Sequence, residues 1–208
     1  MASASKAALV LAATAFLAAC GASLPAPDSI ELTPVPGVAL PYKARVMIYM
    51  SESDQTRKMS IQSSRYRSTE TNIKEGQLLI NATRTLLGKG FQQVEVNAPS
   101  IRPQIVVKPG GKASWSVLDT KAKVGCSLDA YTADGIPIGN FVNRYTMPGE
   151  TDYRDSLEAA YGQCLIKPME DLLTSPALAR LAGAGFRDPP PVAVEAWLRS
   201  LGPMPERR

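Results

Sequence analysis

The segment 121–132 carries the clearest pattern of hydrophobic and polar positions in the chain. Its apolar side chains stand at every second position, and they are Val124, Cys126, Leu128 and Ala130. This alternation predicts a strand with one buried face and one face in water. The dipeptide Asp134-Gly135 that follows is typical of a tight turn. Residues 136–147 are therefore expected to return antiparallel, with a bulge near Gly139.

Shorter apolar segments predict the remaining strands. Their β-branched and aromatic residues favour strands at 45–50, 91–96, 101–108 and 113–118. The sequence Pro109-Gly110-Gly111 indicates a turn between the last two, which would then pair with each other.

Two longer segments predict helices. A capping box of Asn72 and Glu75 is expected to start a helix over 72–88, after the polar segment 51–71. A second helix is expected to start at Thr151. Its apolar positions share one stripe and are Tyr153, Leu157, Ala160, Tyr161, Cys164, Pro168 and Leu172.

These elements place the packed core in residues 42–182. They predict an α+β fold, a two-layer sandwich whose antiparallel or mixed sheet of about four to six strands carries two main helices on one face. The proline-rich segment 20–41 is expected to be an extended tether reaching up to about 65 Å.

The proline-rich tail 183–208 is expected to hold a short amphipathic helix. Its apolar positions are Val194, Trp197, Leu198 and Leu201. Trp197 and Leu198 are candidate contacts either to the protein's own domain or to a groove of a partner protein.

Residues 1–19 have the features of an export signal. Lys6 is their only charge, and the apolar run from Ala7 to Ala19 is shorter than the roughly 20 residues of a membrane-spanning helix. The end of this segment, Leu17-Ala18-Ala19-Cys20, resembles the bacterial lipobox. A plain signal peptide with an incidental cysteine is the alternative.

The lipobox resemblance implies cleavage before Cys20 and attachment of diacylglycerol and a further acyl chain such as palmitate to this residue. Several acyl chains hold a protein on a membrane almost permanently. Gly21 is not the aspartate associated with retention in the inner membrane, so the resemblance implies the periplasmic face of the outer membrane.

Composition narrows the possible chemistry. The 208 residues include no histidine, which excludes histidine-based acid–base catalysis, histidine-containing catalytic triads and histidine metal sites. The sequence also has no Gly-rich phosphate loop, metal-ligand cluster or nucleophile elbow. We therefore expect no enzyme, no metal and no cofactor besides the covalent lipid. The formal charge of +4 is too small for a dedicated nucleic-acid binder, so no nucleic-acid partner is expected.

The two cysteines besides Cys20 form an even pair, which favours a disulfide in an exported protein. Cys126 lies on the apolar face of its strand, and Cys164 lies on the apolar stripe of the helix expected to cover that face. We predict a bond between them, worth about 4 kcal/mol in the chain-entropy model. Two separately buried thiols are the alternative.

The segment between Gln55 and Thr69 has basic residues and no acidic one. The basic residues are Arg57, Lys58, Arg65 and Arg67. Guanidinium groups suit phosphates, so this segment is a candidate contact for phospholipid, lipopolysaccharide or an acidic partner surface. A solvated loop is the alternative.

The layout of residues 42–182 resembles small bacterial envelope lipoproteins of the YajG type, and also accessory lipoproteins of the ABC-transport auxiliary and LptE-like kind. The segments that carry the resemblance are 90–94, 103–107 and 124–135. Together with the export signal, it implies a non-catalytic accessory or assembly subunit of an envelope protein complex for transport, secretion or a surface appendage. The alternative is a module that binds or carries a lipid or glycolipid between the helices and the sheet.

Overall fold

The structure is a computed structural model that describes residues 31–32, 39–62, 70–116, 120–149 and 152–202. The predicted signal peptide, Cys20 and most of the predicted tether lie outside these residues. No helix in the described part of the chain is long and apolar enough to cross a membrane.

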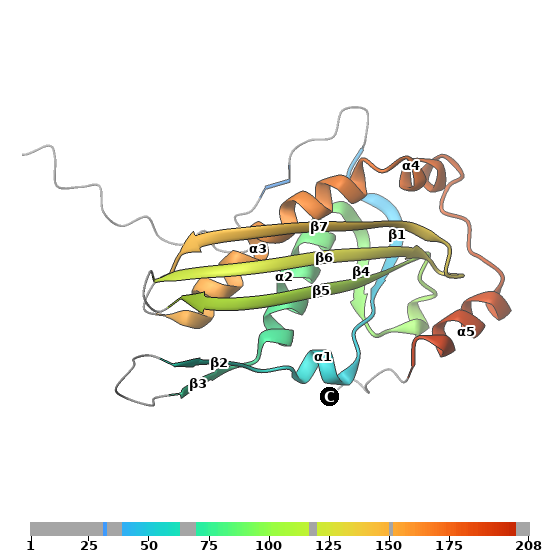
Figure 1. Cartoon of the computed structure of the whole chain (residues 1–208). Coiled ribbons are helices and arrows are strands. Elements are labelled where there is room, and N and C mark those ends of the chain that lie inside the picture. The colour runs from blue at the N-terminus through green and yellow to red at the C-terminus, as the bar shows by residue number, and fades with distance from the viewer. Residues whose placement is uncertain (1–30, 33–38, 63–69, 117–119, 150–151, 203–208) are drawn as a thin grey trace, which may run out of the picture.

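A mixed sheet of five strands forms the centre of the domain, in the order β4-β1-β5-β6-β7. The strands are β1 (Tyr42–Ile48), β4 (Phe91–Val96), β5 (Ile105–Ser116), β6 (Lys121–Thr132) and β7 (Pro137–Pro148). β1 is parallel to both β4 and β5, whereas β5, β6 and β7 are antiparallel to one another. These three long strands face the viewer in Figure 1. The predicted bulge is confirmed as a register shift in β7 next to Gly139.

Two helices, α2 (Glu75–Gly90) and α3 (Tyr153–Leu173), lie behind the long strands in Figure 1. The layer between helices and sheet is a continuous core whose fully buried side chains include Val46, Leu79, Leu128, Leu157 and Leu165. The predicted two-layer α+β fold is confirmed. The short helix α4 (Pro176–Gly183) is capped by Ser175, whose hydroxyl accepts from the N–H of Leu178.

A further helix, α5 (Pro191–Ser200), covers one end of the opposite face of the sheet. A second apolar cluster forms there, and its buried members are Leu198, Met47, Tyr49 and Val106. The Trp197 ring lies 5.4 Å from the ring of Tyr131. Of the two possibilities left open by the sequence, the tail helix therefore docks onto its own domain.

The long strand β5 replaces two predicted strands and a turn. β6 pairs with it over its full length, from Ile105 opposite Thr132 to Ser116 opposite Lys121. Alternate residues of a strand direct their backbone groups to the same side, and the C=O of Val107 accepts from the N–H of Tyr49, the residue after β1. Pro109 therefore points its missing N–H away from β6, where no ladder bond is lost.

The polar segment 51–71 contains three short elements that the sequence pattern did not indicate. They are α1 (Glu52–Thr56), β2 (Met59–Gln62) and β3 (Glu70–Ile73). Asn72 belongs to β3 and bonds to the hydroxyl of Ser60 across the hairpin, so the predicted capping box is wrong. α2 starts after Lys74 with no side-chain cap. Asn72 and Glu75 form no capping box because the Glu75 side chain is buried in the domain.

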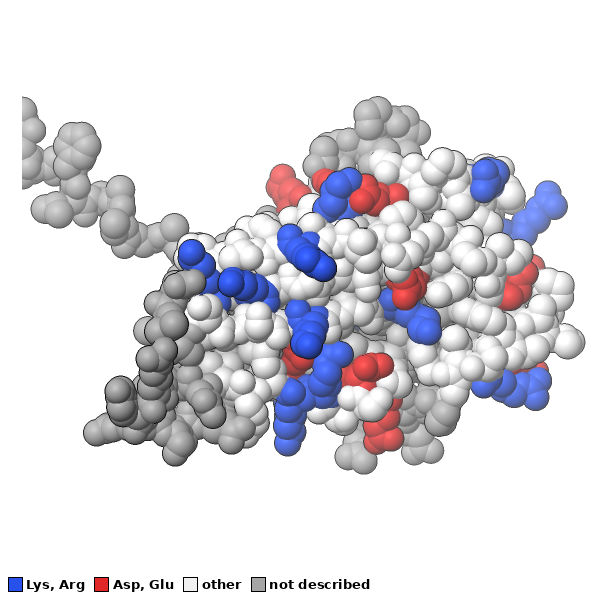
Figure 2. Space-filling model, in the orientation of Figure 1, with Lys and Arg blue, Asp and Glu red and all other residues white. Residues whose placement is uncertain are grey.

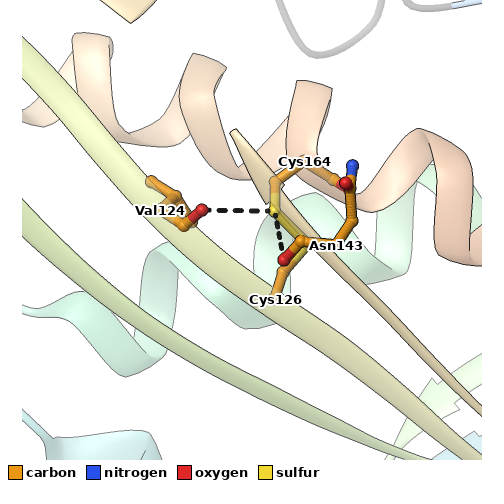
Figure 3. Close-up of a disulfide and its surroundings, with 4 residues drawn as sticks. All are labelled: Val124, Cys126, Asn143 and Cys164. Carbon is orange, nitrogen blue, oxygen red and sulfur yellow. Dashed lines mark hydrogen bonds between the residues drawn. A yellow bond between two sulfur atoms is a disulfide. The ribbon is translucent and has the colours of Figure 1, made fainter. Parts of the chain in front are cut away.

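Cys126 on β6 and Cys164 on α3 form the predicted disulfide (Figure 3). Their Cα atoms are 6.1 Å apart, and both residues are buried. The Cys164 sulfur also lies 3.6 Å from the carbonyl oxygens of Val124 and Asn143. The bond therefore fixes the middle of α3 over the β6–β7 pair.

The docking of α5 can be tested at Leu198. We expect Leu198→Ala to lower the free energy of unfolding by about 2–3 kcal/mol, because it leaves a cavity against Met47 and Val106. Val192, whose side chain in the same helix is 77% exposed, provides the control, and Val192→Ala should change stability by less than about 0.5 kcal/mol. Urea denaturation followed by circular dichroism measures both. Equal midpoints for the two variants would contradict the docked position.

Candidate functional site

The structure places two of the four predicted basic residues, Arg57 and Lys58, beside the free part of β5. Arg57 follows α1, and Lys58 is exposed just before β2. Arg65 and Arg67 lie outside the described residues. Trp197, another predicted contact, packs against the domain. Lys58 is thus the described candidate that remains exposed, because Arg57 is engaged inside the domain.

The outer edge of β5 beyond β1 is closed by side chains instead of a strand. β1 pairs only with residues 105–107 of β5. Further along, the C=O of Gly111 accepts from the Arg57 guanidinium at 2.6 Å, and the N–H of Ala113 donates to the Glu75 carboxylate at 2.5 Å. An arginine and a glutamate therefore satisfy the backbone groups that a neighbouring strand would otherwise take.

Glu75 is the centre of a buried polar network. It is only 4% exposed, and its carboxylate also accepts from Arg57 Nε at 2.9 Å and from the Tyr161 hydroxyl at 2.7 Å. Burial raises the pKa of Tyr161 well above its ordinary value, and the hydrogen bond and negative charge of Glu75 raise this pKa further, while Arg57 opposes the shift. The phenol stays neutral and donates to the carboxylate. The network therefore links the start of α2 to β5, α3 and the segment after α1.

A small pocket lies next to this network, with a volume of about 390 Å³. We call it the edge pocket, and its lining includes Arg57, Lys58, Ser60, Gly111 and Lys112. Lys58 and Lys112 are exposed at its rim. Lys112 also belongs to the open face of the sheet, so the pocket and that face are continuous.

Basic side chains gather on the face of β5, β6 and β7 that α2 and α3 leave uncovered. We call this surface the cationic face, and it contains Lys108, Lys112, Lys121, Lys123 and Arg144. In β5, β6 and β7, side chains alternate between this face and the face toward α2 and α3, where they are more buried. Figure 2 shows the blue side chains collected on this side of the molecule.

The strand register brings three of these cations together in two neighbouring rows. Lys112, Gly125 and Arg144 stand in one row across β5, β6 and β7. Lys123 lies on the middle strand in the next row on the same face, opposite Ser114 and Thr146. A shallow open trough of about 640 Å³ follows this row. Its lining comprises Gly110, Gly111, Lys112, Gly125, Cys126, Ser127, Val142, Asn143 and Arg144.

The cations at the trough are not neutralised within the described residues. The ion pairs formed there involve other basic groups, and Lys112, Lys123 and Arg144 take part in none of them. Asp129, on the same face, bonds to the amide of Asn140. The face can therefore attract an anionic ligand without first breaking an internal salt bridge.

Two features of this site were beyond the sequence pattern. The alternation in the segment 121–132 placed Lys123 and Gly125 on the face in water. The alignment of Lys112 and Arg144 with them depends on strand register. Glu75 looked like a capping residue, and no local signal marked it as buried.

The chain was compared with family models, curated proteins and solved structures. No family model matches it, and no curated protein matches its sequence. Among solved structures it is similar to a PelC dodecamer from Paraburkholderia phytofirmans, with 13% identity, 66% of this chain and 92% of that chain covered, and a TM-score of 0.42. A substituted form of that dodecamer is 14% identical, with 67% of this chain and 95% of that chain covered and a TM-score of 0.40. A protein of Xanthomonas campestris from the family DUF330 is 11% identical, with 75% of this chain and 94% of that chain covered and a TM-score of 0.41. These values carry no conclusion about function.

The network at Glu75 predicts a pH dependence of stability. Folding raises the pKa of Tyr161, so the neutral phenol contributes to the free energy of unfolding. This contribution is complete below about pH 10 and is lost as the pH rises toward the pKa of the folded state. Through this residue the free energy of unfolding should fall by up to about 1.4 kcal/mol per pH unit above that pH. Tyr161→Phe should remove this part of the slope and cost about 1 kcal/mol at neutral pH for the lost hydrogen bond. Urea denaturation across neutral and alkaline pH measures both effects, and identical slopes for the two proteins would refute the assignment.

Proposed function

We propose that the protein is a non-catalytic outer-membrane lipoprotein, anchored through lipid on Cys20 at the periplasmic face, and that it serves as an accessory or assembly subunit of an envelope complex. The lipid would supply location and the tether would supply reach. Confinement near the membrane raises the effective concentration of the domain at its partner. The outer edge of β7 is the observation that carries the docking part of this proposal.

The direction of the backbone groups in β7 follows from the ladder. Since residues 107, 111 and 113 of β5 direct their backbone groups away from β6, the even-numbered residues of β5 bond to odd-numbered residues of β6. The even-numbered residues of β6 then bond to odd-numbered residues of β7. Val142 and Thr146 therefore direct their N–H and C=O groups to the outer edge.

This outer edge supports recognition by strand addition. β7 has 12 residues and pairs with no described strand on that side. Val142 at its middle is 64% exposed. A long edge with unpaired backbone groups is a template for an extended segment of another chain. The open part of β5 is closed by Arg57 and Glu75, and β4, the strand at the other end of the sheet, has only 6 residues. We therefore assign the longer edge, that of β7, to a partner of the envelope complex.

The carrier alternative receives no support from the packing. A lipid between helices and sheet would need an apolar cavity there, but buried side chains from α2, α3 and the sheet fill this layer. The trough and the edge pocket, whose linings include basic side chains, lie on the open face and beside β5.

The anchor is tested at Cys20 and Gly21 in the tagged full chain, expressed in a Gram-negative bacterium. Cys20→Ser should abolish incorporation of a palmitate analogue, because the thiol that carries the lipid is gone. Gly21→Asp should keep the label but move the protein from the outer-membrane to the inner-membrane fraction. Labelling that persists in Cys20→Ser would refute the anchor, and an unmoved Gly21→Asp protein would refute the sorting assignment.

The partner is tested at Val142 in the lipidated protein, extracted from its native membranes in mild detergent. Val142→Pro removes an N–H at the outer edge but no ladder bond, and proline is tolerated at such positions. Val142→Ala is the matched control that keeps the N–H. We expect a stoichiometric envelope protein with the unaltered chain and with Val142→Ala, and at least a tenfold loss with Val142→Pro, which corresponds to about 1.4 kcal/mol. Equal recovery with both variants would exclude strand addition at β7.

A further inference from the structure

The trough on the open sheet face has the geometry of a phosphate contact. Neighbouring strands are about 4.8 Å apart, so Lys112 and Arg144 project from backbones about 10 Å apart with Gly125 between them. A Cβ at Gly125 would meet nothing closer than the carbonyl oxygen of Lys112 at 4.0 Å, so glycine leaves this floor open. Long basic side chains on both sides can therefore converge on a group seated over the glycine.

The surroundings of these cations favour a charged and hydroxylated ligand. Ser114, Ser127 and Thr146 share the open face with them and offer hydroxyl groups. The described lining of the trough contains no aromatic ring, although sugar stacking and protein hot spots commonly use one. Guanidinium and ammonium groups without internal partners are the donors that phosphate oxygens accept from most favourably.

The number and spread of the cations point to a surface and not to one small ion. Lys121 extends the group of cations along β6 beyond Lys123, and Lys58 extends it through the edge pocket. Basic side chains next to an anionic lipid surface each contribute roughly fivefold to binding. A membrane presents many phosphates at once, as this arrangement requires.

We propose that the cationic face binds the phosphate groups of anionic phospholipid headgroups, with Lys112, Lys123 and Arg144 as contact residues and the trough as the seat of a headgroup. The choice of a membrane as the source of the phosphates rests on the proposed lipid anchor, which would hold the domain within reach of a bilayer. The contact would turn the tethered domain so that its sheet lies toward the headgroups, while the outer edge of β7 runs along the side of the domain.

The test uses residues 20–208 with Cys20→Ser, so that binding does not depend on the anchor. This chain contains every element that the structure describes. Its cosedimentation is measured with vesicles of phosphatidylglycerol and phosphatidylcholine in equal amounts, and with vesicles of phosphatidylcholine alone. We expect binding only to the anionic vesicles, and a marked loss when salt rises from about 0.1 M to about 1 M.

The test variant carries Lys112→Gln, Lys123→Gln and Arg144→Gln. The control variant removes the same charge from exposed positions on the helical layer, with Arg84→Gln, Arg154→Gln and Arg180→Gln. The test variant should lose about 100-fold in apparent affinity, and the control variant less than about fivefold. Equal melting temperatures would show that both variants fold.

Three results would overturn the proposal. The unaltered chain could fail to bind anionic vesicles, or the two variants could lose affinity equally, which would mean attraction by net charge alone. Release from the vesicles by millimolar inorganic phosphate at constant ionic strength would show that the trough takes a free anion. None of these results bears on palmitate labelling at Cys20 or on the Val142 variants, so failure here is distinguishable from failure of the proposed function.

Discussion

The buried carboxylate of Glu75 is the contact on which the arrangement of the domain depends. It accepts from the backbone of β5 at Ala113, from Tyr161 on α3 and from Arg57 after α1. A buried carboxylate without such partners would cost several kcal/mol. The start of α2 can therefore lie where it does only because β5 offers a free edge and α3 offers a hydroxyl at the same point. Removing one partner would leave the others unsatisfied, so these elements are coupled in position.

The same contact closes the part of β5 that β1 leaves unpaired. An unpaired edge strand invites association with other chains. β1 pairs with β5 only as far as residue 107. Beyond it, Arg57 donates to the C=O of Gly111 and Glu75 accepts from the N–H of Ala113, so these backbone groups are satisfied without a strand. At the other side of the sheet, β7 keeps its outward groups free of described strands. The open part of β5 is therefore internal to the fold, whereas the outer sides of the two terminal strands, β4 and β7, pair with no described strand.

The two faces of the sheet differ because strand side chains alternate. Toward α2 and α3, the apolar positions of β6 form the core and the disulfide to α3. On the other side, α5 covers the end near Val106, where the outward residues are apolar and aromatic. Beyond this helix the outward residues become basic, small and hydroxylated, and they form the cationic face. The polar positions that allow β6 to be half-buried are thus among the positions that form the cationic face.

The sequence by itself determined the features that arise within one segment. The alternation of β6, the turn at Asp134-Gly135 and the apolar stripe of α3 are local signals, and they were sufficient to predict the α+β class and the Cys126–Cys164 pair. The turn expected at 109–111 was wrong, because pairing with all of β6 outweighed the local preference of proline and glycine. Only the tertiary structure decided that Glu75 is buried and that the basic residues of β5, β6 and β7 align around one trough. Both depend on strand register and on contacts between distant segments, and their free energies arise only when the elements pack together.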